Sequence, residues 1–284
     1  MKRIIILVLL VVLAGLAGVV VRSSSGREIR GLVAQSASGD VRDEIRQTYE
    51  LAPGARVDVG GINGPVKIET SDTKTAEVYI ERTASSQEAL DRRKINIEAD
   101  GNRLSIRGET TQHNFFAKLF GSRASEKVTL KLPRQISLVA KGVNGAVVVG
   151  EIAGAIELSG INGKVQVANA AGSATLKGIN GSVTVGLKSV ATNGIELSGI
   201  NGNIELQLPE NVNASLEAKG MNGRVVSDVP WVSVDEPKHG YYSARIGNGG
   251  TPITAKGING NIRLTRAEKA ASTPAAAAKA ADVK

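Results

Sequence analysis

Lysine and serine share one recurring position in this chain, the residue just before a Gly-x-Asn-Gly motif. Lysine ammonium groups held at a regular spacing could bind an anionic polymer, because opposite charges attract and ionic hydrogen bonds are strong. The opposite interpretation is that Lys alternates with Ser so that like charges do not stack, with Glu157, Glu196 and Glu217 as balancing charges. Both interpretations require a scaffold that aligns this position from repeat to repeat. In chain order the residues are Lys141, Ser159, Lys177, Ser198, Lys219 and Lys256.

A second candidate site lies in residues 228–250, between two copies of the motif. Trp231, Tyr241 and Tyr242 occur there together with Asp235. Glu236 and His239 are also nearby, and aromatic planes beside carboxylates are typical of a carbohydrate subsite, displayed here from a rigid scaffold. The alternative interpretation is an ordinary loop that folds back onto the scaffold.

No catalytic residue, metal site or cofactor site is predicted. The chain has no Cys, which excludes thiolate catalysis and Cys-ligated metals. Its two His, His113 and His239, are far apart and have no companion nucleophile pattern, and no phosphate-binding loop occurs. We therefore expect a protein that is not an enzyme.

The composition favours an all-β protein. Of the 284 residues, 42% are hydrophobic but only 3% are aromatic, and 33 are Gly. A core of Val, Ile, Leu and Ala punctuated by Gly indicates short strands joined by tight turns. The net charge of +8 favours anionic partners, yet no basic run or basic stretch with interleaved aromatics occurs. Nucleic acid is therefore not an expected partner.

The repeats are the most specific feature of the chain. From the second copy onward the spacings between the motif Asn residues are 18, 18, 21, 21 and 37. In residues 155–167, Ile156 and Leu158 alternate with Glu157, as in a half-buried strand. A two-strand unit of about 20 residues is therefore repeated. The seven motif asparagines are Asn63, Asn144, Asn162, Asn180, Asn201, Asn222 and Asn259.

Two architectures can use this unit. Asn-Gly suits a tight hairpin, because both residues tolerate positive φ, and hairpins would give an antiparallel meander. The same pair also suits the corner of a coil in which the strands of successive units pair in parallel. The near-constant period favours the coil, because stacked units would bury one continuous core. The coil predicts an Asn ladder and, beside it, a stack in chain order of Ile161, Ile179, Ile200, Met221 and Ile258.

The repeats resemble those of the bacterial "putative adhesin" family of β-strand repeat proteins, a domain family of unknown function related to the head-GIN domains. The likeness rests on the repeats, on Pro53-Gly54 before them and on the segment 85–90, and it covers residues 45–264. It implies a right-handed parallel β-helix or β-solenoid at the cell surface and no established activity. The insertion at 228–250 departs from a plain repeat.

The N-terminal residues predict export. Met1-Lys2-Arg3 precedes an apolar run over residues 4–21, which suits either a membrane anchor or the core of a cleaved signal peptide. The positive flank places the rest of the chain outside the cytoplasm. We expect four regions: a membrane anchor or signal at 1–22, a flexible spacer at 23–44, the repeat domain at 45–266 with repeats clearest in 136–266, and a disordered Ala-rich tail at 267–284.

The sequence thus predicts a non-catalytic cell-envelope β-solenoid that acts as an adhesive or structural binding module. Expected partners are the membrane, through the N-terminal segment, and an envelope glycan, an anionic polymer or a partner protein. The protein would face the periplasm or exterior, or be secreted if the signal is cleaved. The rival hypotheses are a polysaccharide-acting enzyme on a β-helix and a sensory or regulatory ectodomain.

Overall fold

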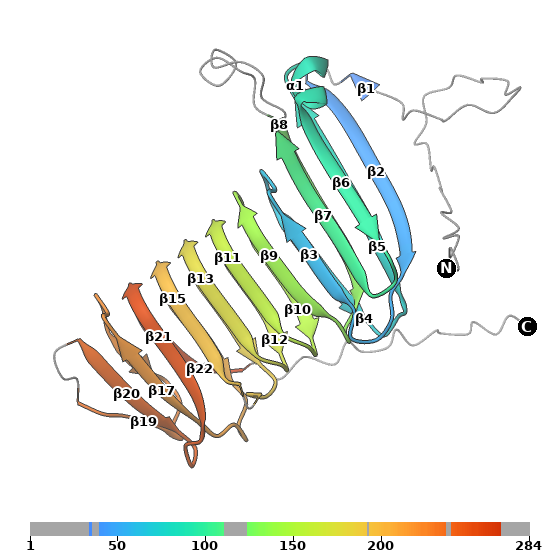
Figure 1. The fold of residues 1–284 in the computed structure, drawn as a ribbon. Helices are drawn as coiled ribbons and strands as arrows, with labels where there is room; N and C mark the ends of the chain where they lie inside the picture. Colours follow the sequence, from blue (N-terminus) through green and yellow to red (C-terminus); the bar gives the residue numbers. More distant parts are fainter. Residues whose placement is uncertain (1–33, 36–39, 111–123, 192, 237–239, 268–284) are drawn as a thin grey trace, which may run out of the picture.

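The computed structural model describes residues 34–35, 40–110, 124–191, 193–236 and 240–267. These residues form an all-β protein with one short helix, α1 (Gln87–Arg92), and two large mixed sheets. Figure 1 shows the strands lying side by side along one long axis, with the N-terminal strands in blue at one end and β17–β20 in orange at the other. The predicted all-β class is confirmed.

Sheet A has eleven strands within the described residues. In spatial order they are β1 (Ala34–Gln35), β2 (Val41–Glu50), β5 (Thr75–Ala84), β8 (Ala124–Pro133), β4 (Val66–Ser71), β10 (Val147–Ile152), β12 (Val165–Ala170), β14 (Val183–Leu187), β16 (Ile204–Leu208), β22 (Ile262–Arg266) and β18 (Val225–Ser227).

Sheet B also has eleven strands in the described part of the chain. In spatial order they are β19 (Val232–Val234), β20 (Tyr241–Ile246), β17 (Ala214–Lys219), β21 (Thr251–Asn259), β15 (Ile195–Asn201), β13 (Ala174–Asn180), β11 (Ile156–Asn162), β9 (Ser137–Val143), β3 (Arg56–Gly60), β7 (Arg103–Thr110) and β6 (Arg93–Ala99).

Each Gly-x-Asn-Gly motif joins one strand of sheet B to one strand of sheet A, and we call these two strands a repeat unit. Neighbouring units pair in parallel: β11 pairs with β9 and β13, and β12 pairs with β10 and β14. The motif is therefore a corner between sheets, and the antiparallel meander is not formed by these units. Their inward residues, such as Leu158 and Leu176, are fully buried in one core between the sheets.

The glycines of the corner serve two separate purposes. The first glycine takes the left-handed backbone, with φ of 61° at Gly160, which strains any residue with a Cβ. The last glycine allows close packing, because a Cβ at Gly163 would lie 2.4 Å from the carbonyl oxygen of Gly145. The left-handed backbone of this corner is thus at the first glycine of the motif.

The motif asparagines form one hydrogen-bonded row. Starting from Asn63, the Nδ2 of each later asparagine donates to the Oδ1 of the one before it in the row, at 2.9–3.1 Å. The spatial order is Asn63, Asn144, Asn162, Asn180, Asn201, Asn259 and Asn222.

The order of the last two units corrects the predicted stack. The unit β21/β22 lies between β15/β16 and β17/β18, so Ile258 pairs with Ile200 and precedes Met221. The physical reason is that β20 folds back antiparallel on the outer edge of β17. Because that edge is occupied, β21 pairs with the other edge of β17.

The N-terminal end is rearranged in a similar way. The unit β3/β4 lies between β9/β10 and the pair β7/β8, although β7 and β8 follow it in the chain. Antiparallel strands complete this end, with β5 and β2 beyond β8 and β6 beyond β7. The helix α1 lies between β5 and β6, begins at the N-cap Ser86 and buries Leu90.

Several predicted regions fall outside the described residues. These are the membrane segment 1–22, most of the spacer 23–44 and residues 268–284 of the tail. The strand β2 begins at Val41, inside the predicted spacer. None of the helices in the described ranges is long and apolar enough to cross a membrane.

Candidate functional site

The outer face of sheet B, turned away from the core, carries a straight row of basic side chains. Register pairs align the position before each motif across seven parallel strands and extend it to Arg107 on β7, which has no motif. We call the basic members of this row the cation row. In spatial order the aligned residues are Arg107, Gly60, Lys141, Ser159, Lys177, Ser198, Lys256 and Lys219.

The spacing of the cation row follows from the strand spacing. Neighbouring strands lie about 4.8 Å apart, so a cation on every second strand repeats at about 9.6 Å. Arg107, Lys141, Lys177 and Lys256 keep this interval, with Gly or Ser between them. Lys219 breaks it, because the inserted unit places Lys256 and Lys219 on adjacent strands.

Carboxylates two residues before the row position on their strands compensate much of this charge. Lys141 Nζ lies 2.7 Å from Glu157, Lys177 Nζ lies 3.0 Å from Glu196, and Lys219 Nζ lies 3.5 Å from Glu217. All six side chains are at least 40% exposed, so each pair contributes at most about 1 kcal/mol. The balancing charges expected from the sequence are thus in place.

Two members of the cation row have no such partner. Neither Arg107 nor Lys256 forms an ion pair with any described residue, and both are exposed. Lys256 lies beside Ser198 on one strand and Lys219 on the other, and the nearest residue on its own strand that faces the same way is Thr254. These two cations are therefore the ones most available to a ligand.

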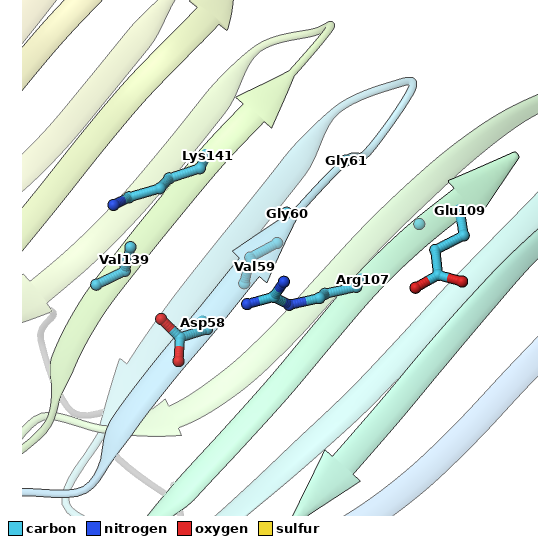
Figure 2. Close-up of a pocket in the computed structure, with 9 residues that line it drawn as sticks. Asp58, Val59, Gly60, Gly61, Arg107, Glu109, Val139 and Lys141 are labelled. Carbon is cyan, nitrogen blue, oxygen red and sulfur yellow. The ribbon is translucent and has the colours of Figure 1, made fainter.

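A depression of about 330 Å³ lies in the row where Gly60 contributes no side chain. Figure 2 shows Arg107 extending from β7 toward β3, which carries Asp58 and Gly60. The Asp58 carboxylate is held by Arg56 at 2.9 Å and Arg103 at 2.8 Å. The depression is therefore lined by the exposed guanidinium of Arg107, the neutralised carboxylate of Asp58 and the exposed carboxylate of Glu109.

The three aromatic residues predicted to form one subsite are placed apart. Tyr241 faces outward at the end of the cation row, with Lys219 Nζ 5.5 Å from its ring centre. Tyr242 points the other way, packs against the core and donates a hydrogen bond to the carbonyl oxygen of Gly223 at 2.8 Å. Consecutive residues of a strand face opposite sides, which is why the pair is divided.

Trp231 also belongs to the C-terminal end of the core. It is half-buried against core residues, and the guanidinium of Arg266 lies 5.2 Å from its ring centre. Its indole Nε1 is buried and has no hydrogen-bond partner among the described residues. Trp231 and Tyr242 thus cover the end of the core. This arrangement corresponds to the alternative interpretation of residues 228–250, a loop that folds back onto the scaffold.

Sequence reasoning did not find Arg107. No motif marks β7, so its place in the row depends on the pairing of β3 with β7. The residue Gly60, which precedes the first motif, was the available signal for an interruption of the row. Among the described residues no cluster of three or more His, Asp or Glu is arranged to hold a metal ion.

Comparison with known proteins gives structural likeness only. No family model and no curated protein matches the chain. Similar solved structures are a putative cell adhesion protein from Clostridium sporogenes (12% identity, 79% of this chain and 100% of that chain, TM-score 0.38) and a putative adhesin from Bacteroides fragilis (15%, 78% and 97%, TM-score 0.32). A third is a putative lipid binding protein from Parabacteroides distasonis (15%, 79% and 97%, TM-score 0.26). The second of these is named a putative adhesin, as is the family that the repeats resemble.

Proposed function

We propose that this chain is a non-catalytic binding module of the cell envelope that holds an anionic polymer along the outer face of sheet B. In this proposal its repeat units wind as a right-handed β-solenoid, and it acts as an adhesive or structural module outside the cytoplasmic membrane. The observation that carries the proposal is the cation row, in which basic residues recur on every second strand from Arg107 to Lys256.

A row of this kind suits a linear polyanion. Each exposed ionic contact contributes at most about 1 kcal/mol, but contacts held on one rigid surface act together once the first has formed. The parallel ladders already fix the spacing of the cations, so binding costs the protein little conformational entropy. Binding should therefore be multivalent and strongly dependent on salt.

The paired carboxylates are compatible with this role. Glu157 and Glu196 bind lysines through exposed contacts that are weak enough to be exchanged for a ligand. These carboxylates lie on separate strands and each is engaged by a cation, which supports a charged binding surface rather than an acid and base pair. Asp235 accepts a hydrogen bond from Ser243 at 2.6 Å, so it too is engaged.

Location outside the cytoplasm rests on the sequence. The basic residues at positions 2 and 3, followed by an apolar run, support export of everything after residue 22. Envelope polymers that carry carboxylates or phosphates would then be the accessible ligands.

The first test measures binding of the full chain, in uncharged detergent, to polygalacturonate at two salt concentrations. The variant is Lys177→Ser with Lys256→Ser, because the repeats already place Ser at this position in Ser159 and Ser198. We expect binding at low salt to weaken about tenfold, which corresponds to about 1.4 kcal/mol, and the salt dependence to fall.

The matched control removes two lysines from the outer face of sheet A. Lys67 and Lys131 are exposed and paired with Glu69 and Glu77, so Lys67→Ser with Lys131→Ser gives the same change in net charge. Its binding should stay within about twofold of the unmodified chain. Equal losses of binding in both variants would mean that net charge, and not the cation row, is responsible for binding. If the unmodified chain does not bind, the proposal is refuted for this polymer.

A further inference from the structure

A second depression, of about 490 Å³, lies on the outer face of sheet A near the C-terminal end. It covers the starts of β14, β16, β22 and β18, and we call it the sheet A hollow. The residues on which its chemistry depends are Lys164, Ser182, Asn203, Asn261, Arg224 and Arg263. All but Arg263 come directly after a Gly-x-Asn-Gly motif, and the sequence analysis singled out only the position before it.

The side-chain oxygens of the two asparagines of the hollow already accept one hydrogen bond each. Asn203 Oδ1 accepts the backbone N–H of Asn261 at 3.0 Å, and Asn261 Oδ1 accepts the backbone N–H of Arg224 at 3.0 Å. A backbone N–H must face an oxygen, so these bonds fix the orientation of both amides. Each amide therefore turns its NH2 group, which can only donate, toward the remaining space.

Cations stand at both ends of the hollow. Lys164 at one end and Arg224 at the other form no ion pair with the described residues. Arg263 uses its Nε to bind Asp228 at 2.6 Å, and this hydrogen bond raises the pKa of its guanidinium above the usual range. It therefore stays charged in solution.

The hollow contains one carboxylate, Glu205, which lies opposite Arg263 on the neighbouring strand. Glu205 Oε1 accepts hydrogen bonds from Gln207 Nε2 and Thr265 Oγ1, both at 3.2 Å. With the amide oxygens also occupied, the free hydrogen-bonding capacity of the hollow consists mainly of donors. A complementary ligand must therefore be rich in acceptors and negatively charged.

The length of the hollow sets the size of the ligand. The post-motif residues lie on the consecutive strands β12, β14, β16, β22 and β18, so Lys164 and Arg224 are four strand spacings apart. At about 4.8 Å per strand this distance is about 19 Å. One small anion cannot contact both ends, whereas a short charged oligomer can.

We propose that the sheet A hollow binds a short segment of a hydroxyl-rich polyanion laid across the strands. One oxyanion contacts Lys164, another lies between Arg224 and Arg263, and the hydroxyl or ether oxygens between them accept from Asn203 and Asn261. The oxyanion is a uronic acid carboxylate or a polyol phosphate, which share this chemistry. The site is on the opposite sheet from the cation row and does not depend on it.

The test uses the full chain in uncharged detergent and two short probes, tetragalacturonate and a glycerol phosphate tetramer, measured by calorimetry. Asn203→Asp keeps the oxygen that accepts from Asn261 but replaces the donor by a charged acceptor. Lys164→Ser with Arg224→Ser removes a cation from each end. Both variants should weaken binding about tenfold or more, because Asn203→Asp exchanges a donor for a charge that repels the ligand and the double variant loses two ionic hydrogen bonds.

Matched controls separate the hollow from general charge effects. Asn102→Asp, on the exposed turn before β7, makes the same change of charge as Asn203→Asp, and Lys67→Ser with Lys131→Ser matches the double variant. Both controls should bind like the unmodified chain. The cation row variant should also bind the short probes normally, even if it has lost the long polymer.

The outcomes are distinct. Loss of tetragalacturonate binding only in the hollow variants identifies a carboxylate ligand, and loss of the phosphate tetramer identifies a phosphate ligand. Binding of neither probe by the unmodified chain, or equal binding by Asn203→Asp and Asn102→Asp, would overturn the hollow as a site. Neither result would affect the cation row, which is tested with the long polymer on the opposite sheet.

Discussion

In the middle of the molecule, from β9 to β16, the order of the units in space is their order in the chain, whereas at both ends it is not. The middle units are 18–21 residues apart and pair with their neighbours in sequence, as Ile156 does with Leu138 and Ala174. At the ends, Asn63 contacts Asn144 across 81 residues and Asn259 contacts Asn201 across 58. At each end, one unit lies between two strand pairs that follow each other in the chain. At the N-terminal end β3/β4 lies between β7/β8 and β9/β10, and at the C-terminal end β21/β22 lies between β15/β16 and β17/β18.

This difference separates two sources of specificity. The middle is specified by the repeat itself, because each unit can bury its apolar face only against the next. The ends are specified by non-repeated strands, since β20 occupies the outer edge of β17 and β6 that of β7. An enclosed unit therefore has neighbours on both sides only when strands that are distant in the sequence pair with it.

The largest effect is expected from cross-links between strands at the C-terminal end. Ser198 and Lys256 lie opposite each other on adjacent strands, whereas Ser198 and Lys219 are two strands, about 9.6 Å, apart. In this chain without Cys, Ser198→Cys with Lys256→Cys should be bridged completely by a short bifunctional thiol reagent. Ser198→Cys with Lys219→Cys should not be bridged.

The readout is the mass of the product and the loss of free thiols. A middle pair that is adjacent in both orders, Ser159→Cys with Lys177→Cys, serves as the positive control. Bridging of residues 198 and 219 but not of 198 and 256 would mean that the units stack in chain order after all.

A smaller but still large effect is expected at the N-terminal end. The Glu126 side chain is 1% exposed, forms an ion pair with Arg93 and accepts the backbone N–H of Asn63 at 2.6 Å. Glu126→Ala should lower the free energy of unfolding by about 3–5 kcal/mol, because a nearly buried guanidinium loses its carboxylate. Chemical denaturation measures this difference.

The matching change in the middle is Glu157→Ala, which removes an exposed partner of Lys141. It should cost less than about 1 kcal/mol. Similar losses of stability for both substitutions would show that the buried ion pair stabilises the N-terminal end no more than an exposed pair stabilises the middle.

The smallest expected effect concerns the asparagine row. The Asn180 side chain in the middle donates to Asn162 and accepts from Asn201, whereas the Asn222 side chain at the end of the row bonds, among the described residues, to Asn259 alone. At about 0.5–1 kcal/mol for each exposed hydrogen bond, Asn180→Ala should cost about 1–2 kcal/mol and Asn222→Ala about half of that. Thermal or chemical unfolding of the two variants side by side tests the ratio, and equal costs would argue against a bonded row.

The sequence alone placed several parts of the site correctly in space. Alternation in segments such as 155–167 indicates which side chains enter the core, and the constant offset from the motif puts Lys141 and Lys177 on one outward line. Arg107 was missed because β7 has no motif. The sequence left two interpretations of residues 228–250 open, because without known pairing it does not show that Tyr241 faces outward and Tyr242 faces the core.

By itself, then, the sequence determined the period, the inward residues and the corner glycines of this protein, since these follow from local backbone geometry and burial. It could not determine the order of the units at the ends. Every unit presents the same motif in the same register, so the pattern fits Asn222 beside Asn201 as well as it fits Asn259 there. Only the tertiary structure decides between them, because the antiparallel strand β20 fills one edge of β17 and leaves the other to β21.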